Sequence, residues 1–203
     1  GRGVYTFCMC PGGRIINSSS EQGRLCTNGM SLSARNYPYS NAAIAVTVFP
    51  DDCGDDPLGG IEFQRAIEEQ AYALGGGTFT APAQRVTDFT RGRIDTGLPP
   101  VSYRPGVVAA DLSRCFPRWM VDELKTGLAQ FDKKMRGFVS ESGVLIGAET
   151  RTSSPVRIVR NGVFQSVSLR GLYPIGEGAG YAGGIVSSAV DGIRCADAIM
   201  SGS

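Results

Sequence analysis

The stretch that decides the fold reads Leu172-Tyr173-Pro174-Ile175-Gly176-Glu177-Gly178-Ala179-Gly180-Tyr181-Ala182-Gly183-Gly184-Ile185. Its apolar start predicts a last short strand over residues 172–175, and the apolar spacing over residues 183–200 predicts a last helix. The glycines between them leave room for a planar or anionic ligand at the first turn of that helix, where free N–H groups carry partial positive charge. The alternative is a tight strand-to-helix connection that holds no ligand.

The same glycines match G-x-G-x-x-G, the pattern of a dinucleotide-binding turn. That fold also needs a second parallel strand and an acidic residue about 20 positions further on. The sequence stops at Ser203, before either is reached. An ADP-binding Rossmann start is therefore not predicted here. A phosphate-binding P-loop is excluded as well, because the Gly-Lys-Ser/Thr triplet is missing.

The composition of the chain argues against several classes of function. The chain has 203 residues, 20 Lys and Arg against 19 Asp and Glu, and no histidine. A net charge of +1 without a basic stripe predicts no nucleic-acid partner. No apolar run reaches the length of a membrane span, and the six scattered cysteines are typical of a reducing compartment, so we expect a cytoplasmic protein. The start Gly1-Arg2-Gly3 lacks an initiating Met, and we expect a piece of a longer protein.

The rest of the chain predicts an α+β fold, a β-rich body with two main helices followed by the C-terminal strand–turn–helix. The expected strands are Val4–Cys10, Arg14–Asn17, Ala42–Phe49, Val144–Thr150 and Val156–Leu169, the third covered on both faces and the last folded back at Asn161-Gly162. The first helix should follow an acidic loop over residues 50–60 and end at Gly75-Gly76-Gly77. The second should have Pro117 in its first turn and stop at Gly137, with an apolar stripe made of Met120, Leu124, Leu128, Phe131 and Met135.

Polar side chains outside the glycine-rich turn are weaker candidates for a functional site. Cationic and hydroxyl donors gather at Arg151, Thr152, Ser153 and Arg157. They could bind an acidic substrate or polarise a carbonyl, or they could form an ordinary solvated loop. The same alternatives apply to Arg35 with Asn28 and Ser31. Cys8 and Cys10 should share one side of a strand, either as buried structural residues or as a redox pair. The acidic residues Asp51, Asp52, Asp55 and Asp56 lack the EF-hand spacing, so no metal site is predicted.

Several motifs together carry a family resemblance. The final stretch, with Ala189-Val190-Asp191-Gly192, resembles the C-terminal flavin motif of FAD-dependent oxidoreductases with two dinucleotide-binding domains. Tyr5-Thr6-Phe7-Cys8-Met9-Cys10-Pro11-Gly12-Gly13, Asn28-Gly29-Met30-Ser31 with Arg35, and Glu149-Thr150-Arg151-Thr152-Ser153-Ser154-Pro155-Val156-Arg157 resemble other motifs of a family of uncharacterised bacterial FAD-dependent dehydrogenases.

This resemblance implies that residues 1–170 are a substrate domain and that residues 171–203 return to a Rossmann-like FAD domain. The residues near the cofactor would be Gly176, Glu177, Gly178, Gly183, Gly184 and Ile185. The implied reaction is hydride transfer between a small organic substrate and FAD, with NAD(P)H as a further redox partner. A chain without the ADP-binding half should be inactive alone, and the helix over residues 183–200 would then need another apolar surface, such as a second copy of the chain. The alternative is a non-catalytic ligand-binding or protein-interaction module with a flavoprotein-like fold.

Overall fold

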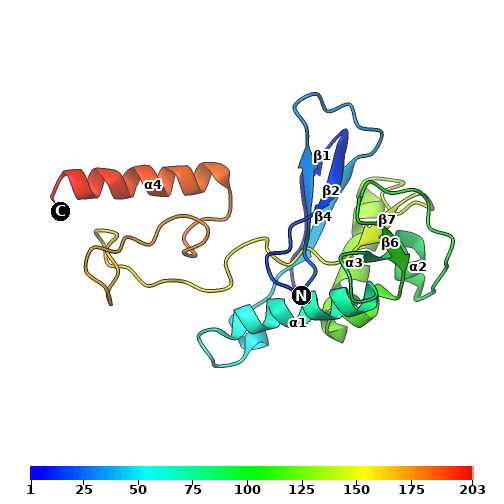
Figure 1. Cartoon of the computed structure of the whole chain (residues 1–203), viewed down its shortest axis with the longest axis horizontal. Coiled ribbons are helices and arrows are strands. Elements are labelled where there is room, and N and C mark those ends of the chain that lie inside the picture. The colour runs from blue at the N-terminus through cyan, green and yellow to red at the C-terminus, as the bar shows by residue number, and fades with distance from the viewer. Residues whose placement is uncertain (203) are drawn as a thin grey trace. The chain divides into compact units, whose positions relative to one another are not determined.

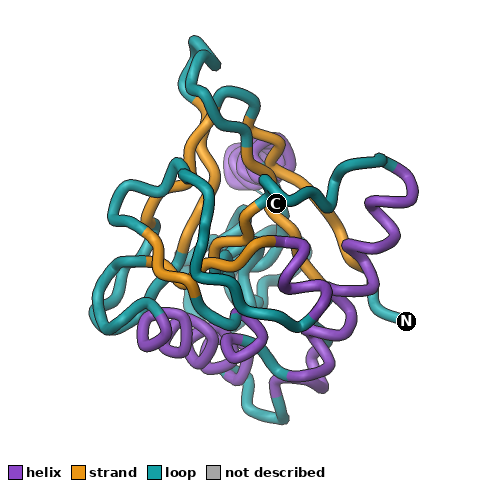
Figure 2. The backbone as a smooth tube through the Cα atoms, turned by 90° about the vertical axis from the view of Figure 1, so that its right-hand side faces the viewer, coloured by secondary structure: helices purple, strands orange, loops and turns teal. Residues whose placement is uncertain are grey.

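The computed structural model describes residues 1–202, and the chain divides into two compact units. Unit 1 comprises residues 1–49 and 65–150, and unit 2 comprises residues 50–64 and the chain from Arg151 onward. Helices and short strands alternate with loops (Figure 2). The predicted α+β class is confirmed.

Unit 1 contains seven strands in three small sheets. The strands are β1 (Val4–Cys10), β2 (Gly13–Asn17), β3 (Thr27–Ser31), β4 (Asn41–Val46), β5 (Ala81–Arg85), β6 (Val107–Ala109) and β7 (Val144–Ile146). Strand β1 pairs with β4 and β2 pairs with β3, both antiparallel (Figure 1). Strand β5 lies parallel to β6 and antiparallel to β7, in the centre of the third sheet.

Two of the predicted helices shape unit 1. Helix α1 (Gly59–Leu74) begins in unit 2 and ends in unit 1, where Gly76 and Gly77 take the left-handed conformation that stops it, as predicted. Helix α3 (Arg118–Lys134) follows Pro117, which is its N-cap residue. A short helix, α2 (Val86–Arg91), follows β5 directly and was not predicted.

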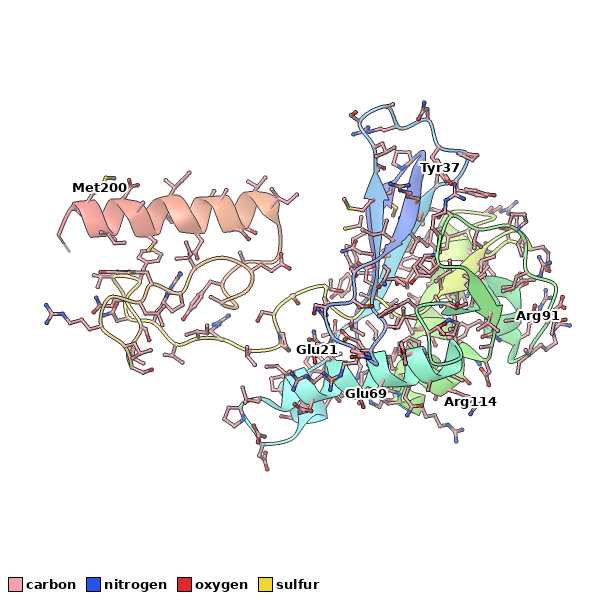
Figure 3. All side chains as sticks on the ribbon, in the orientation of Figure 1. Glu21, Tyr37, Glu69, Arg91, Arg114 and Met200 are labelled. Carbon is pink, nitrogen blue, oxygen red and sulfur yellow. The ribbon has the colours of Figure 1, made fainter. Side chains whose placement is uncertain are left out.

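The core of unit 1 is drawn from the third sheet and the helices around it. Its most deeply buried apolar residues are Leu25, Cys26, Ala71, Ala81, Ala83, Phe89, Tyr103, Leu112, Cys115, Leu128 and Ala148. One buried polar side chain, Gln84, is satisfied at both ends, because its amide nitrogen donates to the Arg93 carbonyl and its oxygen accepts from Leu112 N at 3.1 Å. Glu68 and Asp88 are buried as well, whereas Arg24 bonds Glu69 and pairs with Glu21 outside the core (Figure 3).

Unit 2 consists of a 3-10 turn, the start of α1, a long loop over residues 151–184 and helix α4 (Ile185–Met200), which lies along that loop (Figure 1). The face of α4 toward the loop is made of small and polar residues at helical spacing, Ser188, Asp191, Gly192 and Cys195. Its opposite face is apolar and open to solvent. The side chains there include Ile185, Val186, Ile193 and Met200, which are 91%, 76%, 62% and 78% exposed. Met200 points away from the loop (Figure 3).

Of the predicted strands, two are absent, and the one over residues 42–49 forms as β4 but is shorter and less buried than predicted. The segment over residues 42–49 ends its pairing at Val46 and belongs to a two-stranded sheet, so it is half-buried on average rather than covered on both faces. Residues 156–169 form one isolated bridge, Arg160 to Ser166, and no strand. Residues 172–175 also lie outside any strand, because their carbonyls accept bonds from the loop: Ser166 N binds Leu172 O at 2.8 Å, and the Arg160 side chain binds Pro174 O.

Strand β1 carries a bulge at its thiols. Cys8 and Met9 both lie opposite the single residue Ala42, which breaks the strict alternation of side chains before Cys10. Cys8 has a φ of 49°, in the left-handed region, and is exposed. The prediction that the two thiols share one side of the strand is therefore wrong, and the alternative that they are buried structural residues fails for Cys8. All six cysteines of the chain are free thiols.

Within residues 1–202, no helix combines the length and the apolar character that crossing a membrane requires.

Candidate functional site

The glycine-rich turn forms as a closed loop of backbone. Gly180 N donates to Glu177 O at 2.9 Å, and Tyr181 N donates to Gly176 O at 3.0 Å. Gly176 and Gly180 have φ values of 71° and 82°, a conformation that side chains with a Cβ rarely adopt. The turn therefore needs glycine at these two positions for its own geometry.

The segment over residues 154–158 packs against this turn and hydrogen-bonds to it. A Cβ at Gly180 would lie 2.5 Å from the Val156 carbonyl oxygen, so the two backbones touch. Ser154 Oγ donates to Gly178 O at 3.2 Å, and Arg157 Nε donates to Gly180 O at 3.0 Å. The structure thus brings Arg157, a predicted substrate-binding residue, to the turn itself. Arg151, Thr152 and Ser153 precede it on the same segment.

An ion pair that the sequence analysis did not single out joins the turn to α4. Arg160 bonds Asp191 with two parallel contacts of 2.7 and 2.8 Å, and the two side chains are 11% and 13% exposed. Asp191 also accepts from Gly176 N at 2.9 Å, and Arg160 donates to Pro174 O at 2.8 Å. The ring of Tyr181 lies 3.6 Å from the guanidinium carbon. The hydrogen bond from Arg160 is the largest cause that lowers the pKa of Asp191 to about 2.

The start of α4 is open. Gly184 is its N-cap residue in extended backbone, and no side chain caps the helix. Added Cβ atoms at Gly178 and Gly183 would meet nothing within 4 Å, and Ile185 is 91% exposed. Among residues 1–202, no hydrogen bond or ion pair engages the carboxylate of Glu177. Of the six predicted cofactor residues, Gly178, Gly183 and Ile185 are exposed, and Glu177 and Gly184 are partly covered. Gly176 is buried, and its N–H donates to Asp191.

Other motifs meet in unit 1, around the turn between β1 and β2. Ser31 Oγ donates to Pro11 O at 3.2 Å, and Tyr37 N donates to Gly12 O at 3.3 Å. Gly12 packs directly on the Arg35 carbonyl, where a Cβ would clash. Arg35 is exposed, and its backbone has a φ of 46°, in the left-handed region. Arg35 thus belongs to a different unit from the other catalytic candidates.

The acidic loop lines a cavity of about 460 Å³ in unit 2. Asp52, Asp56 and Glu62 line it together with Leu58 and Phe63. Within the part of the chain that the structure describes, no group of three or more His, Cys, Asp or Glu residues could hold a metal ion.

Comparison with known proteins identifies the family. The model of the family described as "FAD-dependent protein, C-terminal domain-like" matches residues 1–152, so the chain belongs to this family. An uncharacterized protein of Clostridium beijerinckii (strain ATCC 51743 / NCIMB 8052) is 51% identical over 202 residues, covering 98% of this chain. The chain spans 38% of the length of that relative. The family match contains Arg35 and Glu149, and the turn lies beyond it.

The residues of the turn fit a flavin. The ring system of FAD is planar and accepts negative charge when reduced, and the open helix start offers a flat approach and unused N–H donors. The hydroxyls of its sugar-alcohol chain are donors for a free carboxylate such as Glu177.

Proposed function

We propose that this chain is part of an FAD-dependent oxidoreductase that transfers hydride between a small organic substrate and the flavin, with residues 176–185 contacting the cofactor. The single observation that carries the proposal is the uncapped start of α4, where Gly183 and Gly184 leave the helical N–H groups open. Membership of an FAD-dependent family supports it independently.

When bound, the flavin would supply the hydride-accepting ring. The N–H groups at the start of α4 would stabilise negative charge at the edge of that ring, because a helix start carries a partial charge of roughly +0.5. Glu177 would accept hydrogen bonds from the sugar-alcohol hydroxyls. The Arg160–Asp191 pair would hold the turn in place on α4 before the cofactor arrives.

The remaining assignments extend this proposal. Arg151, Thr152 and Ser153 would bind the substrate, because they offer cationic and hydroxyl donors on the segment that leads to the turn. Residues 1–170 would form the substrate domain, and residues 171–203 would complete a Rossmann-like FAD domain in a protein of the relative's length. NAD(P)H is the proposed second redox partner.

The test is flavin occupancy of the full-length protein. Gly183→Val places a side chain in open space, so the fold should survive while the ring is blocked from the helix start. Gly162→Val is the matched control, since an added Cβ there also meets nothing within 4 Å. We expect at least tenfold lower flavin content, read from visible absorbance, in the Gly183 variant alone. A wild-type protein that carries no flavin and takes none up on reconstitution would overturn the proposal.

One observation favours a second candidate, a non-catalytic ligand-binding or protein-interaction module. The apolar face of α4 is open to solvent, as expected of a surface that binds another protein. The two candidates differ in the redox behaviour of the full-length protein. An oxidoreductase passes electrons between flavin and substrate through many turnovers, whereas a binding module would hold its ligand unchanged.

A further inference from the structure

Arg157 is held against the glycine-rich turn by its backbone. Gly180 lacks a Cβ at the point where Arg157 approaches, and an added Cβ would lie 3.0 Å from the Arg157 Cα. The next residue is tied to the turn as well, because Ile158 N donates to Ala179 O at 3.2 Å. Both segments belong to unit 2. The close approach of the two backbones therefore places this arginine directly on the turn.

The guanidinium group of Arg157 is oriented by two contacts. Its Nε donates to Gly180 O at 3.0 Å, and its central carbon lies 5.1 Å from the centre of the Tyr181 ring. That ring is itself fixed, because the Tyr181 hydroxyl accepts from Arg160 N and donates to Ile158 O, both at 3.1 Å. An arginine that only faces solvent keeps its rotamer freedom, whereas this one has given up part of that freedom before any ligand arrives.

The two terminal nitrogens of Arg157 point to a ligand, because they have no acceptor within residues 1–202. No hydrogen bond or ion pair of this part of the chain engages them, and the residue is exposed. Arg160 lies over the same aromatic ring but differs, since Asp191 neutralises it through two hydrogen bonds. A planar fork of N–H donors that is oriented and carries no carboxylate partner is suited to the oxygens of a phosphate group.

We propose that Arg157 binds a phosphate group of the flavin cofactor and makes the site selective for phosphate-bearing flavins over riboflavin. This inference rests on the proposed function. Glu177 and Arg157 are charges of opposite sign on the same turn, and neither is paired within the described residues. Glu177 offers acceptors to the sugar-alcohol hydroxyls that all flavins share, and Arg157 offers donors to the phosphate that riboflavin lacks. The anionic oxygens of an acidic substrate would fit the same fork, and flavin affinity measured without substrate distinguishes the two sources.

Flavin binding to the full-length apoprotein tests this selectivity. Arg157→Gln removes the charge and the fork, and Arg170→Gln is the matched control, because Arg170 is an exposed arginine of the same long loop. The affinities for FAD, FMN and riboflavin are measured by the quenching of flavin fluorescence. Arg157→Gln should weaken the binding of FAD and FMN about tenfold or more, as expected for the loss of a charge-assisted hydrogen bond, and that of riboflavin less than about twofold. Arg170→Gln should leave all three affinities within about twofold of wild type.

Three outcomes of this experiment would overturn the inference and leave the proposed function standing. Equal weakening of all three flavins by Arg157→Gln would mean that Arg157 only supports the turn. An unchanged affinity for FAD is the result expected if Arg157 binds an acidic substrate instead. An equal loss of FAD affinity in Arg170→Gln would mean that the general charge of the loop, and not the oriented fork, attracts the phosphate.

A second measurement requires no bound flavin. Phenylglyoxal modifies accessible arginines, and peptide mass spectrometry of the flavin-free full-length protein reads Arg157 and Arg170 separately. Inorganic pyrophosphate should slow the modification of Arg157 about threefold or more and leave that of Arg170 unchanged. Absence of protection at Arg157, or equal protection of both arginines, would overturn the phosphate site. A full-length protein that takes up no flavin would refute the proposed function, and protection by pyrophosphate would still decide whether Arg157 binds phosphate.

Discussion

Replacement of Asp191 by Asn should loosen α4 from the turn that precedes it. Asp191 holds Arg160 through two short hydrogen bonds and Gly176 N through a third, so one carboxylate ties the helix to two points of the loop. Asn keeps the shape of the side chain and one acceptor oxygen. The substitution therefore removes mainly the charge, and a cation is left enclosed next to Tyr181.

The magnitude follows from the pKa of Asp191. The hydrogen bond from Arg160 is the main cause that lowers it from 3.8 to about 2, a difference that corresponds to roughly 2.5 kcal/mol of stabilisation. Neighbouring atoms cover most of both side chains, but the pair lies close to the surface of unit 2, so water screens part of this energy. Because Asn retains part of the bonding, we expect a loss of about 2 kcal/mol, below the 3–5 kcal/mol typical of removing one partner of a buried pair altogether.

Native-state hydrogen exchange of the α4 amides measures this loss. A change of about 2 kcal/mol should accelerate their exchange roughly 30-fold. Asp197→Asn makes the same chemical change at an exposed position of the same helix and should leave exchange within about twofold of wild type. Equal protection of α4 in the two variants would refute the reasoning that this pair anchors the helix.

The effect should also depend on pH in a defined direction. Folding lowers the pKa of Asp191, so the pair contributes its full stabilisation above pH 3.8 and loses it as the pH falls through about 2. Wild type and Asp191→Asn should accordingly differ most above pH 3.8 and converge near pH 2.

Two further predictions follow from the same region. Gly180→Ala forces a Cβ into left-handed backbone and against the Val156 carbonyl, so the hydrogen-exchange protection of α4 should fall by about 2 kcal/mol. Gly178→Ala adds a Cβ in open space and should change that protection by less than about 0.5 kcal/mol. Unchanged protection of α4 in the Gly180→Ala variant would contradict the close approach of the two backbones. The isolated 203-residue chain should self-associate through the apolar face of α4, and Val186→Glu with Ile193→Glu should abolish the association in sedimentation experiments; a strict monomer at all concentrations would rule out this use of the face.

Helices α1 and α3 could be predicted from sequence because each combines a periodic apolar face with a local boundary signal. Gly76 and Gly77 end α1 in left-handed backbone, and Pro117 precedes α3. The exception, α2, does end at a left-handed glycine, Gly92, but its six residues are too few for a periodic apolar face and no side chain caps its start. Met135 was included in the stripe of α3, but it is the C-cap residue and is 44% exposed.

The strands were harder to predict because pairing depends on distant partners. Asn161-Gly162 predicted a two-residue hairpin, but the Asn161 side chain accepts from Val163 N and Gln165 N and so stabilises a wider local turn. Asn28 and Gly29, by contrast, lie inside β3, although this dipeptide is typical of turns. A Cβ at Gly29 would displace the end of the Asn41 side chain.

The glycines of the site could be predicted, whereas the contacts that hold them in place could not. Gly176 and Gly180 are signalled by composition alone, since many glycines in one short stretch indicate a special backbone. Arg160 and Asp191 are 31 residues apart and share no motif, so only the folded chain pairs them. Arg157 was visible in a motif, but the contacts that hold it against the turn are properties of the fold.

The most direct measurement of the central claim is hydrogen exchange at the start of α4 in the full-length protein, with and without FAD. The backbone amides of Gly183, Gly184 and Ile185 are open in this structure, and contact with the flavin ring should slow their exchange at least tenfold. Bound flavin with unchanged exchange at these three amides would contradict the account.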